Sequence, residues 1–436
     1  MANRAPPIDR ALRKASLRLT PLLLLGYVVG YIDRLNISFA ASQMNADLKF
    51  SAAAYGVGAS LFFLGYALLE APSNLILVRI GARRWIARIL ITWGLLSACT
   101  LLVRTPLQFW LVRLALGSAE AGFFPGVLYF LSTWFPADQR GRAISRFYIG
   151  YPLATLVMGA ASGAILRLDG LFRLRGWQWL FLVEGAPAVL VGLAILFFLT
   201  DSPQSAQWLT AEERQALVDR LDPPSPRHGL VETLSVLKSP RLWLLGLGLM
   251  LSFLALTAFS FSAPSILAKS TGMDLAQVGY LVAATGVMGI GTMLGVGWWA
   301  DRTRRRHLIA ASSPLILGAG YAALALAPGA ISAIAAFSLT QFSSYLLQGV
   351  YWTLPSRISS GPRLALVYAA LNTLGQIGSF FGPVSFGLLR DATGSYTLGF
   401  LVLIAPLILS CAALYFGGRE TRPDPCVPQA LGRARS

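Results

Sequence analysis

The sequence is poor in charge, cysteine and histidine. Only 13% of its 436 residues are charged and 55% are hydrophobic, whereas soluble proteins carry roughly 25% charged residues. We therefore expect an integral membrane protein. Cys99 and Cys411 fall in apolar runs and Cys426 in the tail, so no disulfide framework is expected. His228 lies in a polar linker and His307 in a basic loop, so neither histidine suggests a metal site. The sequence contains no Walker-type loop, which argues against ATP as the energy source.

Acidic residues are also scarce: 19 Asp and Glu stand against 36 Lys and Arg, a net charge of +17. A net positive charge can indicate nucleic-acid binding or reflect membrane topology, and the positions of the basic residues distinguish the two. Twelve apolar runs are each long enough to span a bilayer as a helix. If the N-terminus lies inside, inner segments carry 27 of the 36 basic residues and outer loops carry 7. This is the positive-inside bias, so no nucleic-acid partner is expected.

The bias predicts a multi-pass membrane protein with both termini in the cytoplasm. Three arginines of one outer loop, Arg167, Arg173 and Arg175, run against the bias and have no explanation from sequence. The predicted spans are 19–40, 54–78, 85–103, 107–131, 144–166, 178–199, 242–268, 276–299, 307–327, 330–354, 364–388 and 396–417.

The chain divides into two related halves. An offset of 223 residues aligns Arg79 with Arg302, and the same offset aligns Arg140 with Arg363. One offset that serves two separated places indicates an internal repeat, and parallel six-helix repeats with a central site are a known transporter architecture. The AEERQALVDRL stretch between the halves is predicted to form a short amphipathic helix. The expected units are a first bundle 1–199, a linker 200–240, a second bundle 241–418 and a tail 419–436.

Several motifs resemble a known family. GWWADRTRRR, between the eighth and ninth spans, resembles the loop signature of the major facilitator superfamily, and NLILVRIGARR is a degenerate copy in the first half. GYIDRLNISFA, FFLGYALLEAPSNLILVRIGARRWIARIL and GSAEAGFFPGVLYFLSTWFPADQRGRA resemble the anion:cation symporter family, near its bacterial tartrate-type branch. The resemblance implies an all-α polytopic membrane protein with twelve transmembrane helices in two pseudo-symmetric six-helix bundles. It also implies a location in the bacterial inner membrane, and a part in gating for the loop residues Arg79, Arg83, Asp301 and Arg302.

Two acids and two arginines, Asp33, Glu120, Arg34 and Arg113, lie deep inside predicted spans of the first half. A helix rises about 1.5 Å per residue, which places Asp33 and Arg113 at similar depth, where they are expected to pair. Glu120 and Tyr66 come out together near mid-membrane. Asp33 and Arg34 point roughly 100° apart on a helix, so they cannot both serve one static pair. Intramembrane charges mark substrate or proton pathways by default, although static ion pairs that hold helices together are the alternative.

The chemistry of these residues suits an organic anion. Arginine offers a two-pronged contact to a carboxylate that lysine cannot, and carboxyl groups near an arginine can bind and release protons as it moves. The family resemblance implies that Asp33 and Glu120 couple protons, that Arg34 binds the substrate carboxylate and that Arg113 bridges to the acids. It places pocket positions at Tyr31, Tyr66, Tyr151, Trp352 and Asn372, to which the neighbouring Tyr351 is added as a candidate lining residue.

Two further acids lie in the spans. Glu70, in the inner part of the second span, is predicted to form an ion pair at the cytoplasmic end, and Glu184 is predicted to be structural. The second half has no evident intramembrane Lys, Arg, Asp or Glu. We therefore expect charge chemistry in the first half of the site and shape selection in the second.

The leading hypothesis is a monomeric secondary transporter without a cofactor. It would import a small organic anion, such as a tartrate-like or sugar-acid carboxylate, by proton symport with alternating access. The alternative is a proton-antiporting exporter of drugs or metabolites, but GYPLATLVMGAASGAIL in the fifth span lacks the Gly-Pro pattern of such exporters. A membrane enzyme would need a nucleophile and base, and no such pair is visible in the sequence.

Overall fold

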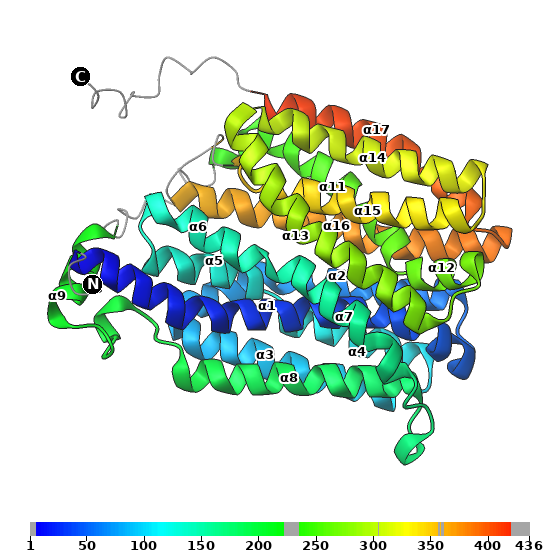
Figure 1. The fold of residues 1–436 in the computed structure, drawn as a ribbon, viewed down its shortest axis with the longest axis horizontal. Coiled ribbons are helices and arrows are strands. Elements are labelled where there is room, and N and C mark those ends of the chain that lie inside the picture. Colours follow the sequence, from blue (N-terminus) through cyan, green and yellow to red (C-terminus); the bar gives the residue numbers. More distant parts are fainter. Residues whose placement is uncertain (1–5, 222–234, 304, 356–357, 359–361, 420–436) are drawn as a thin grey trace.

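The computed structural model describes residues 6–221, 235–303, 305–355, 358 and 362–419, and this part of the chain is helical without a strand. Figure 1 shows the helices running side by side along one direction. The first half contains α1 (Pro7–Leu48), α2 (Ala52–Ile80), α3 (Ala82–Cys99), α4 (Pro106–Glu120), α5 (Phe123–Trp134), α6 (Ala137–Tyr148), α7 (Gly150–Leu166) and α8 (Gly176–Phe198). The second half contains α11 (Pro240–Ser260), α12 (Ala263–Thr271), α13 (Leu275–Thr303), α14 (Arg306–Leu326), α15 (Ala330–Tyr351), α16 (Pro362–Thr393) and α17 (Thr397–Gly418), and the linker contains α9 (Ala211–Arg220).

These helices supply the expected membrane spans. Eleven stretches among the described residues are long and apolar enough to cross a bilayer, and α16, with 32 residues, has the length of a twelfth. Three of the predicted spans are interrupted: α4 and α5 share one, α6 and α7 share another, and α11 and α12 share a third. The predicted all-α fold of twelve spans is confirmed.

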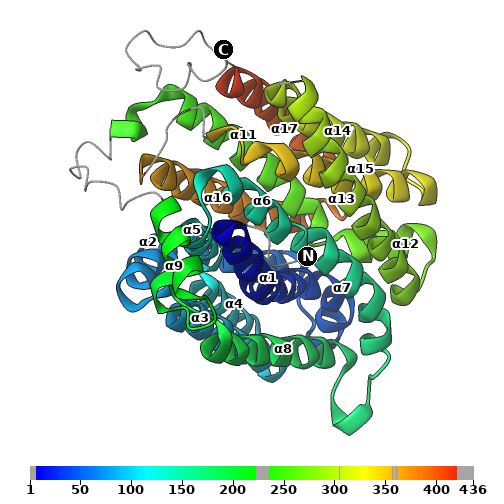
Figure 2. The same cartoon turned by 60° about the vertical axis from the view of Figure 1, so that its left-hand side comes forward.

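The two halves of the chain lie side by side (Figures 1 and 2). Helix α1 begins and α17 ends at the same end of the molecule, called here the termini end; the opposite end is the far end. Contacts between the halves run mainly from α2 to α16 and from α7 to α13. The repeat offset of 223 relates these two contacts: a Cβ atom at Gly56 would overlap the carbonyl of Pro383, and one at the equivalent Gly279 would overlap that of Gly159.

Hydrogen bonds join the halves at the far end. The Tyr55 hydroxyl lies 3.1 Å from the carbonyl oxygen of Ile37 and 3.0 Å from that of Phe261. The Asp391 carboxylate accepts from the first two N–H groups of α2, those of Ala52 at 3.2 Å and Ala53 at 2.9 Å. These N–H groups have no partner within their own helix, so Asp391 caps α2 from the other half.

Two more contacts complete this far-end seam. The Ser60 hydroxyl accepts from the N–H of Val384 at 3.0 Å, and Arg167 lies 3.4 Å from Asp274 across the halves. Tyr55, Ser60, Arg167 and Asp391 each contact the opposite half of the chain. We call these four contacts the far-end seam. These contacts join the two halves at that end of the molecule.

The basic outer loop that sequence did not explain now has partners. Arg167 meets Asp274, and Arg175 lies 3.2 Å from Asp47 and 3.9 Å from Asp169. Two of the three arginines are therefore bound to acids of the far end, and their charge is locally compensated.

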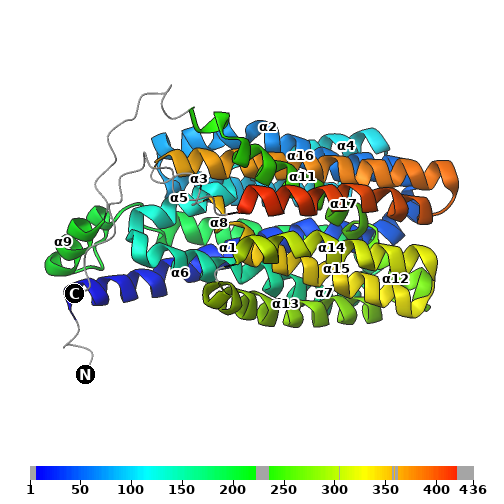
Figure 3. The same cartoon turned by 90° about the horizontal axis from the view of Figure 1, so that it is seen from above.

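The linker helix α9 lies beside the start of α1 at the termini end (Figure 3). The Thr210 hydroxyl accepts from the Glu213 N–H and the Glu213 carboxylate accepts from the Thr210 N–H, a capping box that starts the predicted helix. Lys14 of α1 lies 2.7 Å from the same carboxylate. Burial acts to raise the pKa of Glu213, but the hydrogen bonds from Lys14 and Thr210 outweigh it and hold the pKa below its usual range.

Candidate functional site

The site is organised by a break in the fourth span. Helix α4 ends at Glu120, and α5 begins at Phe123. Gly122 between them has φ +88°, and a Cβ atom there would overlap the Ser73 hydroxyl, so only glycine fits without strain. The span predicted over 107–131 is present as Pro106–Trp134, but the sequence analysis did not foresee that two helices share it. The break leaves Glu120 as the last residue of a helix, facing the space between the halves.

Arg34 is the direct partner of Glu120. Its Nε lies 2.9 Å and its Nη2 2.5 Å from the same oxygen, Oε1. Within the described residues, Oε2 of Glu120 has no hydrogen-bond partner. Aromatic rings surround the guanidinium, with its Cζ 5.5 Å from the ring centre of Tyr31, 5.4 Å from that of Phe62 and 5.1 Å from that of Tyr66. Such cation–π contacts hold the arginine in place.

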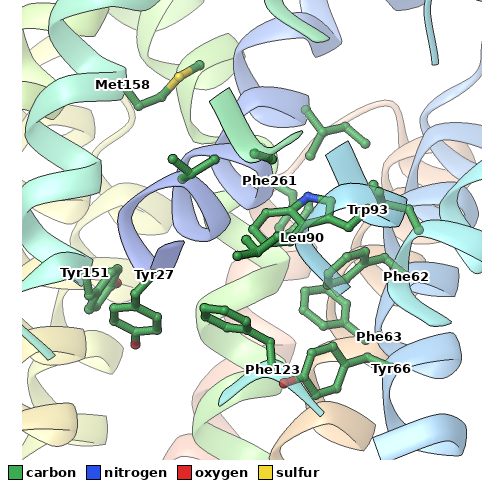
Figure 4. Packing of buried hydrophobic residues seen from close by; sticks show 14 of the residues in the cluster. Tyr27, Phe62, Phe63, Tyr66, Leu90, Trp93, Phe123, Tyr151, Met158 and Phe261 are labelled. Atoms are coloured by element: carbon green, nitrogen blue, oxygen red, sulfur yellow. The ribbon is translucent and has the colours of Figure 1, made fainter. Parts of the chain in front are cut away.

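The pair forms part of the wall of a cavity between the halves. The empty space measures about 500 Å³, part of it open to solvent. Figure 4 shows Tyr27, Phe123 and Tyr66 following one another across the aromatic side of this region. The lining residues are Tyr27, Gly30, Tyr31, Arg34, Tyr66, Glu120, Phe123, Phe124, Tyr148, Phe253, Gln348, Trp352, Asn372 and Gln376.

Asp33 points away from the cavity. It is 1% exposed, and its Oδ1 accepts hydrogen bonds from the Ser97 hydroxyl of α3 and from the Asn36 amide, the latter at 3.3 Å. Its Oδ2 has no partner among the described residues. Adjacent Asp33 and Arg34 therefore occupy different surroundings, one packed against α3 and the other at the cavity.

Arg113 is equally buried and does not line the cavity. Its guanidinium lies 4.8 Å from the ring centre of Phe62, and none of its nitrogens has a hydrogen-bond partner in the described part of the chain. Asp33 and Arg113 attract each other electrostatically, but the expected direct pair is absent among these residues. The depth argument fixed the height of each charge and not its direction around the helix.

Glu184 of α8 belongs to the same buried region. It is 6% exposed, and neither of its carboxylate oxygens has a hydrogen bond of normal geometry within the described residues. Asn36 and Asp33 are the polar groups that interact with it. A polar cluster of Asp33, Asn36, Arg113 and Glu184 thus lies inside the first half, beside the cavity.

Among the described residues, Glu70 does not form the ion pair expected at the cytoplasmic end. Its carboxylate instead reaches across to α16, where Oε1 accepts from the Asn372 amide and Oε2 from the Thr373 hydroxyl at 3.1 Å. Glu70 is 1% exposed. The sequence reading was wrong here because no pattern within one half reveals a neutral partner in the other.

The remaining predicted pocket residues are divided between the cavity and its surroundings. Tyr31, Tyr66, Trp352 and Asn372 line it. The Tyr151 hydroxyl bonds to Ser344 of the other half at 2.9 Å, and its ring lies 4.4 Å from that of Tyr31, so it supports the wall.

Tyr351 lies away from the cavity, where its hydroxyl donates to the Leu245 carbonyl at 3.0 Å. The sequence analysis missed several aromatic lining residues. For Tyr27 a signal existed, since it lies one helical turn before Tyr31 on the same face. The missed residues are Tyr27, Phe123, Phe124, Tyr148 and Phe253.

The loop residues expected to gate lie at the termini end. The N–H of Arg83 donates to Asp201 at 2.8 Å, and its side chain lies 3.9 Å from the same carboxylate. Arg79 is exposed. Arg302 stacks over Trp298 at 5.5 Å. The side chain of Asp301 lies outside the described residues.

Comparison with known sequences identifies the family. The family model described as Major Facilitator Superfamily matches residues 23–383. The chain belongs to this superfamily. It is therefore a membrane transporter and not an enzyme. A relative from Agrobacterium vitis named as a tartrate transporter is 39% identical over 93% of this chain and 90% of its own length. A relative from Acinetobacter baumannii named as a quinolone resistance transporter is 36% identical over 92% of this chain and 94% of its own length.

Solved structures agree on the fold. A bacterial homologue of the human lysosomal transporter Spinster matches this transporter with a TM-score of 0.77 at 19% identity. The match covers 92% of this chain and 97% of the other. At this identity the likeness establishes the shared fold alone.

Proposed function

We propose that this transporter carries a small organic carboxylate across the bacterial inner membrane together with protons, by alternating access and as a monomer. The observation that carries the proposal is the ion pair of Arg34 and Glu120 in the wall of the cavity between the halves. The relative named as a tartrate transporter supports an organic anion as cargo. The positive-inside bias supports cytoplasmic termini.

Competition for Arg34 would couple the anion to the proton. A substrate carboxylate and Glu120 both need the same guanidinium, and an unpaired charge in a buried site is costly. When Glu120 takes a proton, Arg34 becomes available to the substrate, and the site stays electrically balanced. When the substrate leaves, Glu120 returns to Arg34 and releases its proton. Loading the anion and loading the proton thus favour each other.

Asp33 is the second proposed proton site. It lies one residue from Arg34 but faces α3, and its Oδ2 has no partner within the described residues. Arg113 would respond to the charge of both acids, because it interacts electrostatically with Asp33 and with Glu120. A change at Glu120 would then be felt at Asp33 without direct contact between the two carboxyl groups.

Alternating access would use the far-end seam as one gate. The seam joins the halves at the end opposite the termini, so release of its contacts would open the cavity to the outside. The loop residues Arg79, Arg83, Asp301 and Arg302 remain the proposed gating set at the termini end.

Transport into liposomes tests the proposal. Purified protein would first be screened against a panel of carboxylates by thermal shift, since a ligand that binds only the folded state raises its stability. Uptake of a bound anion should then accelerate when an inward proton gradient is imposed. Glu120→Gln should remove this acceleration while exchange of labelled for unlabelled anion continues. Equal uptake with and without the gradient would contradict proton coupling.

The second candidate is proton-driven export, favoured by the relative named as a quinolone resistance transporter. The same ion pair would serve antiport if protons displaced the cargo from the site without travelling with it. The direction of the driving gradient separates the two: antiport predicts that an anion inside liposomes leaves faster when the outside is acidified, and symport predicts that it leaves more slowly.

A further inference from the structure

We infer that the cavity selects monocarboxylates with an aromatic body and rejects compounds with a second carboxylate; this inference rests on the proposed function. Among the described residues that line the cavity, Arg34 is the one cation. It can compensate one carboxylate. Arg113 cannot serve a second, because it lies beneath the Phe62 ring and does not reach the cavity.

The wall is suited to an aromatic ring. Eight of the fourteen lining residues are aromatic, from both halves of the chain. Phe124 of α5 and Trp352, which follows α15, meet across the cavity with ring centres 5.9 Å apart. A flat aromatic body can stack on such side chains or meet their edges, which adds to the burial of its apolar surface. A compact polyhydroxylated acid would leave most of this wall without a partner.

Glu70 disfavours a second negative charge at the side of the cavity formed by α16. Its oxygens accept hydrogen bonds from the Asn372 amide and the Thr373 hydroxyl, and donors of this kind favour the ionised form of a carboxyl group. Asn372 lines the cavity and Glu70 does not, so the Glu70 carboxylate is separated from the cavity by the Asn372 side chain that bonds to it. A second substrate carboxylate placed there would meet a like charge with low exposure to water, where repulsion is strong.

The same arrangement favours a neutral polar group. With one N–H committed to Glu70, Asn372 retains its second N–H and its carbonyl oxygen. Gln348 and Gln376 add amide groups on the same half of the cavity. An amide or hydroxyl on the substrate can bond to these groups. The site therefore places a carboxylate at Arg34, a ring along the aromatic wall, and a neutral polar group near Asn372.

A matched set of ligands tests this selection. Benzoate, 4-carbamoylbenzoate and terephthalate share one ring and differ only in the group opposite the carboxylate. Binding to the purified full-length transporter should be measurable for the first two and at least tenfold weaker for terephthalate. Cyclohexanecarboxylate, which lacks the aromatic ring, should bind more weakly than benzoate. Tartrate and galactonate represent the dicarboxylate and sugar-acid alternatives.

Two variants separate the charge of Glu70 from its structural contacts. Glu70→Gln removes the charge and keeps the size, so the gap between terephthalate and 4-carbamoylbenzoate should narrow at least threefold. Thr373→Val removes one hydrogen bond to Glu70 and leaves the charge in place, so the gap should persist. If both variants change the gap equally, Glu70 acts through structure and the assigned role is wrong.

The outcomes also distinguish the inference from the function on which it rests. Tighter binding of tartrate or galactonate than of benzoate would overturn the inference and leave proton-coupled carboxylate transport intact. Binding of none of these carboxylates would overturn the inference together with the proposed function.

Discussion

Arg34 gives both of its hydrogen bonds to one oxygen of Glu120 and leaves the second oxygen without a partner in the described part of the chain. The arginine is held by these two hydrogen bonds and by the rings of Tyr31, Phe62 and Tyr66. The second oxygen of Glu120 is a place where a proton can be added without breaking an existing hydrogen bond.

The geometry at Arg34 predicts that a positive charge alone is insufficient for carboxylate binding. Arg34→Lys keeps the charge but loses the planar fork that meets two acceptors at once. We expect carboxylate binding to weaken about tenfold or more, which corresponds to about 1.4 kcal/mol. Titration calorimetry on the purified variant would measure the loss. The control is Arg104→Lys, at an exposed arginine whose side chain donates to the backbone carbonyls of Leu101 and Val103. Equal affinity of Arg34→Lys and wild type would contradict the prediction.

The break after Glu120 should depend on Gly122. Gly122→Ala would place a side chain at φ +88° and against Ser73. Non-glycine residues in such a conformation cost roughly 1–3 kcal/mol, so we expect a lower Tm and reduced transport.

The control for this change is Gly141→Ala. A Cβ atom at Gly141 in α6 would have no atom within 4 Å, and alanine is the better helix former, so Tm should stay level or rise. Combining Gly122→Ala with Ser73→Gly removes the overlap but not the strained φ, and should recover stability only in part. A Gly122→Ala variant as stable as wild type would show that the break does not require glycine.

We expect two acids of the far end, Asp391 and Asp274, to differ in how strongly they hold the far-end seam closed. Asp391→Ala removes two hydrogen bonds to the N-terminus of α2, where the helix dipole also favours the negative charge. Across the halves, Asp274→Ala breaks an ion pair whose side chains are 72% and 58% exposed, and such pairs contribute little; the hydrogen bond it also loses, from the Gln277 N–H, lies within the second half. We expect the far end to open more often in the first variant than in the second.

Cysteine labelling measures this opening. Ser265 lines a depression at the seam, so Ser265→Cys in a background without the three native cysteines offers a reporter. An impermeant maleimide should modify it several-fold faster with Asp391→Ala, and at nearly the original rate with Asp274→Ala. Identical rates in both variants would show that capping by Asp391 does not hold the seam closed.

The linker contact should depend on pH. Because the pKa of Glu213 is held below its usual range, the contact stabilises the docked linker above the unfolded pKa of about 4.3. This stabilisation is lost as the pH falls through the lower folded value. Hydrogen exchange of α9 amides, corrected for intrinsic rates, should show protection at pH 7 that declines below about pH 4.

Lys14→Met should weaken that protection already at pH 7, because it removes a donor 2.7 Å from the carboxylate. Glu212→Gln is the control, since the neighbouring Glu212 is 80% exposed and lies 4.0 Å from Arg10. Loss of α9 protection in Glu212→Gln as large as in Lys14→Met would contradict a specific role for Glu213.

The sequence was informative wherever one helix carries the signal. Apolar length predicted the spans, and a 100° step between neighbours predicted that Asp33 and Arg34 diverge. It was uninformative where rotation of one helix against another decides the contact. The depths of Asp33 and Arg113 had suggested that these two would pair. Arg113 instead has no direct partner in the described structure, and Glu120 pairs with Arg34. The break at Gly122 was missed for a different reason, because hydropathy runs unbroken through EAGFFPG and reports no backbone angle.

The far-end seam also limits how much energy a transport cycle requires. Its hydrogen bonds each contribute on the order of 1 kcal/mol, and several end on backbone groups that water can satisfy once the halves part. Shifting a two-state equilibrium from 1:99 to 99:1 takes about 5.5 kcal/mol. A seam of this kind is strong enough to keep one conformation dominant and weak enough for the binding of one small ion and its proton to reverse the balance.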